Sequence, residues 1–258
     1  MIIDSHCHLN YDPMHLSLDE TISRAKKNGV EYMLTISTDD KSYKQIIDIV
    51  DKYDSVYGTY GIHPHEAKNH QNIISNIIIE KKKESKKIIG IGETGLDFFY
   101  NYSEKNDQIS SFLEHIDAAQ KLDIPLIVHT RAAESETFNI LLRAVKNKDT
   151  KILIHCFTGT KEFAFKLIDI GAYISSSGVV TFKKSKNLAD TFKEIPSSRI
   201  LVETDAPYLA PEPLRGKPNE PSYITHTIKF LSDLKKIKYE EFSSITSNNF
   251  IKLFGILK

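Results

Sequence analysis

The sequence predicts one (β/α)8 barrel domain over residues 1–258. Short apolar runs alternate with amphipathic segments along the whole chain, and eight such pairs fit a barrel, which needs roughly 250 residues. Continuous apolar runs between helices are typical of parallel strands that are covered on both faces. An open, doubly wound sheet is the alternative architecture.

The expected elements follow the chain in order. Apolar runs predict strands over 1–3, 30–36, 56–62, 88–92, 126–128, 152–154, 172–175 and 200–202. Apolar residues at helical spacing predict helices over 19–28, 41–53, 73–84, 104–122, 134–145, 162–170, 187–194, 223–235 and 239–254. Gly29 is placed to cap the first helix, Ile46, Ile47 and Val50 form the apolar stripe of the second, and Pro196 closes the seventh.

Composition excludes several classes of protein. Lys and Arg together number 34, as do Asp and Glu, so a protein that coats long duplex DNA through overall positive charge is not expected. Two cysteines, Cys7 and Cys156, exclude a disulfide scaffold and indicate a reducing compartment. We see no signal peptide and no apolar run long enough to span a membrane, so we expect a soluble, cytoplasmic protein. The oligomeric state is left open.

Residues that commonly bind metals recur where the predicted strands end. His6 and His8 stand two positions apart, so in an extended chain both imidazoles project to the same side. The full set at strand ends is His6, His8, His63, His65, Glu93, His129, His155 and Asp205. Barrel enzymes place their chemistry at the carboxyl ends of the strands. His15, His70, His115 and His226 fall elsewhere and are expected to be ordinary surface residues.

Even four of these six imidazoles, taken with the two carboxylates, exceed what one tetrahedral metal site with an open position requires. They suit two adjacent divalent cations bridged by Glu93 and a water molecule. Asp205 would bind one cation and accept the proton of the attacking water. The alternative for each carboxylate is a helix cap or a structural salt bridge. Imidazole ligands favour Zn²⁺ or Mn²⁺, whereas Mg²⁺ prefers oxygen.

Eight ordered segments carry a family resemblance over nearly the whole chain. They are Asp4–Leu9, Gly61–His65, Gly90–Asp97, Pro125–Arg131, His155–Gly159, Glu203–Leu209, Arg215–Pro221 and Asn248–Phe250. With these segments the chain resembles the TatD family of metal-dependent deoxyribonucleases, within the amidohydrolase-like barrel superfamily. Two positions depart from the family pattern: Ala132 stands where an acidic residue is frequent, and Tyr100 where an arginine is common.

The resemblance implies a two-metal phosphodiesterase that acts on DNA, with several members described as 3′→5′ exonucleases. The implied metal ligands are His6, His8, Glu93, His129, His155 and Asp205. Members typically depend on Mg²⁺. The expected partner is therefore DNA, chiefly its single-stranded ends. The expected process is DNA repair or degradation.

Five further residues are candidates for holding the substrate, namely His63, Arg131, Tyr208, Arg215 and Lys217. His63 would hydrogen-bond a phosphate oxygen, Tyr208 would stack on a base or sugar, and the cations would pair with phosphate. The plain alternatives are an Arg131–Glu134 ion pair, simple packing of Tyr208, and a solvated loop around Arg215.

Two other functions remain open. The same metal ligands would serve a hydrolase of amides or esters, such as a D-aminoacyl-tRNA deacylase, because an activated water attacks carbon as well as phosphorus. A metal-stabilised nucleic-acid-binding protein without turnover is the third hypothesis, and it would be expected to lack a ligand or the proton acceptor.

Overall fold

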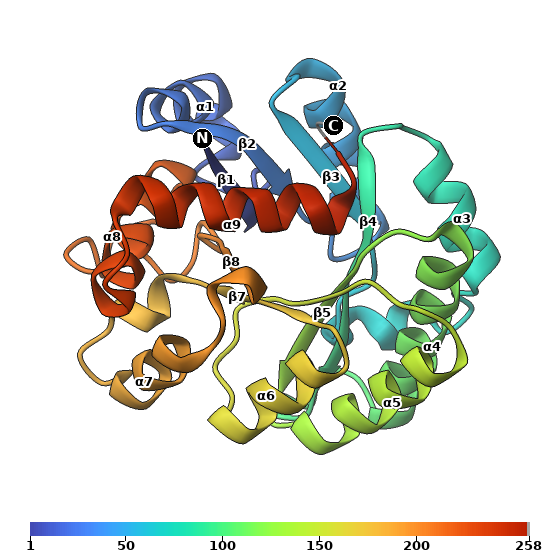
Figure 1. Cartoon of the computed structure of the whole chain (residues 1–258). Helices are drawn as coiled ribbons and strands as arrows, with labels where there is room; N and C mark the ends of the chain where they lie inside the picture. The colour runs from blue at the N-terminus through green and yellow to red at the C-terminus, as the bar shows by residue number, and fades with distance from the viewer. Residues whose placement is uncertain (257–258) are drawn as a thin grey trace. The chain divides into compact units, whose positions relative to one another are not determined.

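The computed structural model describes residues 1–256 (Figure 1). Its strands are β1 (Ile2–Cys7), β2 (Val30–Thr35), β3 (Val56–Tyr60), β4 (Ile88–Asp97), β5 (Leu126–Arg131), β6 (Ile152–Ile154), β7 (Tyr173–Ser176) and β8 (Ile200–Val202). Its α-helices are α1 (Leu18–Lys27), α2 (Asp40–Lys52), α3 (Ser75–Lys83), α4 (Lys105–Leu122), α5 (Glu134–Asn147), α6 (Lys161–Asp169), α7 (Lys186–Glu194), α8 (Ile224–Lys235) and α9 (Tyr239–Phe254).

The strands form one eight-stranded sheet in chain order, from β1 to β8. The pairs β1–β2, β3–β4, β4–β5, β5–β6 and β7–β8 are parallel, and a helix follows nearly every strand, as connections between parallel strands require. The predicted (β/α)8 class is confirmed. Among residues 1–256, no helix is both long enough and apolar enough to cross a membrane.

The chain divides into two compact units. The first unit comprises Met1–Thr35, Cys156–Phe165 and the described residues from Tyr173 onward, and the second comprises Ile36–His155 and Lys166–Ala172. The expectation of one domain over 1–258 stays a prediction.

In the first unit, the first and last strands lie side by side. The Asp205 N–H donates to the His6 carbonyl (2.9 Å), and the His8 N–H donates to the Ala206 carbonyl (2.8 Å). α9 packs against β1 and β8 (Figure 1), and its Ser243 hydroxyl donates to the Met1 carbonyl at 2.9 Å. The amino terminus is thereby held beside this helix.

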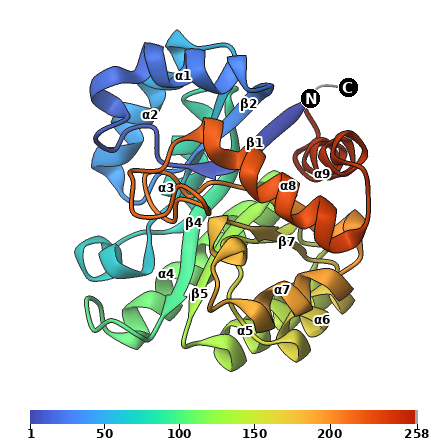
Figure 2. The ribbon, with the colours of Figure 1, turned by 90° about the vertical axis from the view of Figure 1, so that its left-hand side faces the viewer.

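In the second unit, β4 is the strand with the most extensive pairing. It pairs with β3 and β5, and α4 lies along it (Figure 2). Gly95 has φ +134°, and a Cβ there would lie 2.1 Å from the His129 carbonyl oxygen. Glycine at this position lets β4 approach β5 closely enough to continue pairing as far as Asp97 with Arg131.

The strands predicted over 1–3 and 88–92 are too short. β1 continues to Cys7 and β4 to Asp97, so His6 and Glu93 lie within strands rather than just beyond them. Apolar periodicity did not predict these extensions because polar residues and glycines follow the apolar runs. The strands continue there through backbone pairing, which does not require apolar side chains. The helices agree with prediction to within a few residues at each end.

Candidate metal centre

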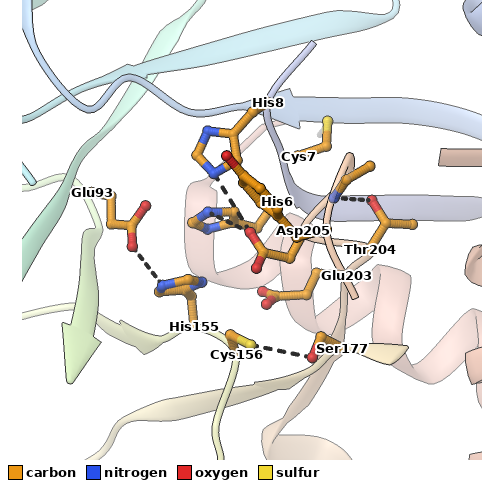
Figure 3. Close-up of polar contacts among 12 residues, drawn as sticks. His6, Cys7, His8, Glu93, His155, Cys156, Ser177, Glu203, Thr204 and Asp205 are labelled. Atoms are coloured by element: carbon orange, nitrogen blue, oxygen red, sulfur yellow. Dashed lines mark hydrogen bonds and ion pairs between the residues drawn. The ribbon is translucent and has the colours of Figure 1, made fainter. Parts of the chain in front are cut away.

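Glu93 lies at the centre of the ligand group in the second unit. The side chain is buried, with 3% of the residue exposed. Its Oε1 atom lies 2.7 Å from His155 Nε2, 3.0 Å from His129 Nδ1 and 3.5 Å from His63 Nε2. Figure 3 shows the Glu93–His155 contact. One carboxylate therefore gathers imidazoles from the ends of three other strands.

The backbone around Glu93 is tightly held. The Glu93 N–H donates to the Ser37 carbonyl at 3.1 Å. A Cβ on Gly61 would come within 2.4 Å of the Gly92 backbone, so β3 and β4 meet here through glycines. This close approach fixes the direction in which the Glu93 side chain leaves the strand.

Asp97 is a second carboxylate in this group, and sequence reasoning did not identify its role. Its Oδ2 atom lies 3.1 Å from His129 Nε2 and 3.0 Å from His65 Nε2. A carboxylate behind a metal-binding histidine orients the ring and makes it a stronger ligand. If β4 had been predicted to continue to Asp97, the even spacing of Glu93 and Asp97 would have placed both carboxylates on the same face of the strand.

Ionisation in this group follows from burial and neighbouring charges. Burial by itself would raise the pKa of Glu93, but the imidazoles of His155 and His63 and hydrogen bonds from His129 and His155 hold that pKa well below its usual range. Burial likewise opposes ionisation of Asp97, whose pKa is nevertheless lowered, first by its hydrogen bond with His129. Both carboxylates are therefore anionic at neutral pH.

His129 lies between these two anions. Burial would lower its pKa, but hydrogen bonds to Asp97 and Glu93 raise it. Ionised carboxylates only accept hydrogen bonds, so both ring nitrogens donate when no cation is bound. A cation at Nδ1 would displace one proton, and the Nε2–H would still donate to Asp97.

His63 has a different role from the other imidazoles. Its Nδ1 accepts a hydrogen bond from the His65 N–H at 3.1 Å, and burial holds its pKa well below the ordinary value. The neutral ring therefore carries its proton on Nε2, the atom that faces Glu93. A donor at this place suits an anionic oxygen better than a cation, in keeping with the predicted contact to phosphate.

The first unit carries the other ligand group, built from β1 and the loop after β8 (Figure 3). Asp205 Oδ1 lies 3.5 Å from His8 Nε2 and 3.7 Å from His6 Nε2. His6 and His8 are buried, whereas 14% of the Asp205 side chain is exposed. The backbone hydrogen bonds between these two segments hold the three side chains together.

Two further carboxylates surround this group. Glu203 is fully buried, and the Ser175 hydroxyl donates to its Oε2 atom. Asp4 accepts hydrogen bonds from the Thr204 N–H and hydroxyl at 3.0 and 2.5 Å. Burial raises the pKa of Asp4 to about 7. Asp4 thus ties β1 to the segment that presents Asp205, and Glu203 is a carboxylate near the ligands that sequence reasoning missed.

The donor sets fit a divalent metal. Ligand atoms of Glu93, His129 and His155 all lie within 3.3 Å of one another. Each unit offers imidazole nitrogens together with a carboxylate oxygen, the combination that suits Zn²⁺ or Mn²⁺. His6, His8 and Asp205 would hold a cation in the first unit, and Glu93, His129 and His155 in the second. The assignment of all six as ligands stays a prediction.

The remaining candidate residues have exposed side chains, Arg131 at the end of β5 and the other three in the loop after β8. Arg131 covers the rings of Phe99 and Tyr100, with its guanidinium carbon 4.1 and 4.9 Å from the ring centroids. Arg215 lies over Phe182 at 4.3 Å, and Lys217 is exposed two residues further on. Tyr208 is 54% exposed and meets the His8 ring edge to face at 6.4 Å.

His115 is not a surface residue, and the expectation that it was is wrong. It is 0% exposed on α4, where its Nε2 accepts from the Ile62 N–H (3.0 Å) and its Nδ1–H donates to the Ser111 carbonyl (2.7 Å). The periodicity of apolar residues along a helix does not show whether a histidine on that helix faces the core. Burial lowers the pKa of His115 to about 4.

We expect His115 to make folding stability depend on pH. The unfolded chain protonates this residue below about pH 6.5, whereas the folded protein resists protonation until about pH 4. The stabilisation is complete above pH 6.5 and is lost as the pH falls, up to about 3 kcal/mol at pH 4. Urea unfolding at pH 7 and pH 4 should show that His115→Gln loses less free energy of unfolding between these two pH values than the wild-type protein does. Equal losses in both proteins would contradict this expectation.

The family model described as "TatD related DNase" matches residues 3–255. An uncharacterized metal-dependent hydrolase of Buchnera aphidicola (subsp. Acyrthosiphon pisum) is 41% identical, with 99% of each chain covered. The protein named "3'-5' ssDNA/RNA exonuclease TatD" of Klebsiella pneumoniae is 31% identical, with 92% of each chain covered.

Solved structures share the fold. The TatD homologue YJJV of Escherichia coli has a TM-score of 0.88 and 24% identity, with 99% of this chain and 98% of that chain covered. The named relatives and the two ligand groups bear out the prediction of a metal-dependent hydrolase. The match over nearly the full length shows that this chain belongs to the TatD family of DNases.

Proposed function

We propose that this protein is a two-metal phosphodiesterase that removes nucleotides from the 3′ ends of single-stranded DNA. The observation that carries the proposal is the buried, anionic Glu93 with three imidazoles around one of its oxygens. The relative named as a 3′–5′ exonuclease of single-stranded DNA and RNA supports this choice of substrate.

Divalent cations, when bound, would supply Lewis acidity that activates water and stabilises charge on the leaving oxygen. The residues around them have distinct tasks. Asp97 holds the His129 ring in the orientation that presents Nδ1 beside Glu93. The His63 Nε2–H donates to a phosphate oxygen. Asp205, the least buried ligand of its group, accepts the proton of the attacking water.

A cluster of exposed cations in the first unit favours an anionic substrate. Lys183 and Lys184 follow β7, and Arg215 and Lys217 follow β8; all four are exposed. The two loops are joined, because the Glu212 N–H donates to the Thr181 hydroxyl at 2.9 Å and Arg215 covers Phe182. Positive side chains on connected loops would follow the phosphates of a strand.

Metal removal is the direct test of this proposal. We expect purified protein to release labelled nucleotides from 3′-labelled single-stranded DNA with Mg²⁺, Mn²⁺ or Zn²⁺, and to release none in excess EDTA. Re-addition of one of these cations should restore the activity. A 5′-labelled strand in parallel should shorten progressively instead of releasing its label first, which sets the direction of cleavage.

Absence of cleavage with every cation, in protein shown to bind two metals, would overturn the nuclease proposal. The same preparations would then be tested on a D-aminoacyl-tRNA, because metal-activated water also attacks an ester carbonyl. EDTA-resistant cleavage would overturn the metal dependence itself.

A further inference from the structure

Three aromatic side chains stand exposed in the loop that follows β4. Phe99 is 58% exposed, Tyr100 38% and Tyr102 53%. Large aromatic rings are usually buried, and a group of them in water is typical of a binding surface. We call Phe99, Tyr100 and Tyr102 the aromatic platform.

The rings of the platform are arranged in contact with one another. Tyr100 and Tyr102 are stacked, with centroids 5.3 Å apart and planes 27° from parallel. Phe99 meets Tyr100 edge to face at 4.8 Å. Arg131 lies over both Phe99 and Tyr100, so a cation is held against these two rings.

Hydrogen bonds hold the platform loop in place. Asp97 Oδ1 accepts from the Phe99 N–H (3.0 Å) and the Tyr100 N–H (3.2 Å). At the other end of the loop, the Ser103 hydroxyl donates to the His65 carbonyl at 2.8 Å. A loop anchored at both ends presents its rings at a lower ordering cost on binding than a free loop would.

The platform is in direct contact with the Glu93 group. The His65 ring meets Tyr102 at 4.7 Å and Tyr100 at 5.5 Å. The same His65 hydrogen-bonds Asp97, and Asp97 hydrogen-bonds the His129 ring beside Glu93. A nucleotide seated on the platform would therefore lie close to this group of ligands.

We propose that the aromatic platform stacks unpaired bases of the DNA substrate and that Arg131 pairs with the adjoining phosphate. This inference rests on the proposed function and names the residues that select single strands. Aromatic rings stack on every base, and a guanidinium binds phosphate, so this combination suits a single strand of any sequence. In a duplex the base faces are covered by their neighbours and cannot reach the rings.

The experiment measures binding separately from cleavage. A fluorescent phosphorothioate strand, which resists hydrolysis, is titrated with the metal-loaded protein and followed by anisotropy, alongside an abasic strand of equal length. We expect the Tyr100→Leu/Tyr102→Leu double variant to bind the base-containing strand about 10-fold more weakly than wild type. Both proteins should bind the abasic strand equally.

Two matched variants keep the test specific. Tyr100→Phe/Tyr102→Phe preserves the rings and should bind as wild type does. Tyr53→Leu removes a ring that also carries a cation, Lys52 at 4.9 Å, but precedes β3 and so lies at the amino end of a strand. It too should leave binding unchanged. Unfolding temperatures equal to that of the wild-type protein would exclude misfolding of the variants.

The platform proposal would be overturned if the double Leu variant bound with wild-type affinity. It would also be overturned if the wild-type protein bound base-containing and abasic strands equally. Failure of the proposed function looks different. In that case wild-type protein would fail to cleave both labelled DNA and methyl p-nitrophenyl phosphate, a small diester without a base.

Discussion

Glu93→Gln is expected to reduce DNA cleavage to the rate seen without enzyme. The substitution preserves the shape of the side chain and removes the negative charge around which His63, His129 and His155 gather. The pKa of Glu93 lies well below its usual range, so this side chain is an anion at neutral pH. A neutral amide is a much weaker ligand for a divalent metal. Cleavage of 3′-labelled DNA and metal content by elemental analysis are both measured.

The matched control is Glu80→Gln on α3, whose side chain is 72% exposed and paired with Lys83. It makes the same chemical change away from the ligands and should retain full activity and metal content. If folded Glu93→Gln kept wild-type rates, the bound cation would not depend on this carboxylate, and the proposed centre would be wrong. Circular dichroism checks that each variant is folded.

Asp205→Asn is expected to lower the rate of cleavage by about 100-fold to 10,000-fold, the range typical of losing a general base. Asparagine keeps an oxygen near His6 and His8 but does not accept a proton at neutral pH. Loss as a ligand and loss as a base are separated by metal content. Retained metal with a lost rate points to the proton-accepting role, and lost metal points to the ligand role.

Asp190→Asn on α7 serves as the control for this change. Asp190 is exposed and pairs with Lys186, one helical turn away, at 2.7 Å. Unchanged cleavage is expected. Near wild-type turnover in Asp205→Asn would exclude Asp205 as both ligand and base, and another carboxylate in the first unit, Glu203, would be tested next.

Local chemistry in the sequence was sufficient for the fold class. Apolar runs such as 152–154 and 200–202 coincide with β6 and β8 because a strand buried on both faces needs apolar residues throughout. Residues with metal-binding chemistry stood out because they interrupt or follow such runs. His6, Glu93 and Asp205 were found in this way.

The ends of β1 and β4 were not predictable from apolar periodicity. β4 continues through Thr94 and Gly95 because its backbone pairs with β5, and pairing does not require an apolar side chain. For the same reason Asp97 read as a loop residue, although it is 1% exposed and hydrogen-bonded to His129.

By itself, the sequence determined the (β/α)8 class, the family and the residues with the chemistry to bind metal. Only the tertiary structure decided that Asp97 supports His129, that His63 faces Glu93 as a proton donor, and that His115 is buried. The physical reason is that each role depends on a partner from a distant segment. Asp97 and His129 lie 32 positions apart, and Ile62 and His115 lie 53 apart. The pKa and orientation of a side chain are set by such partners.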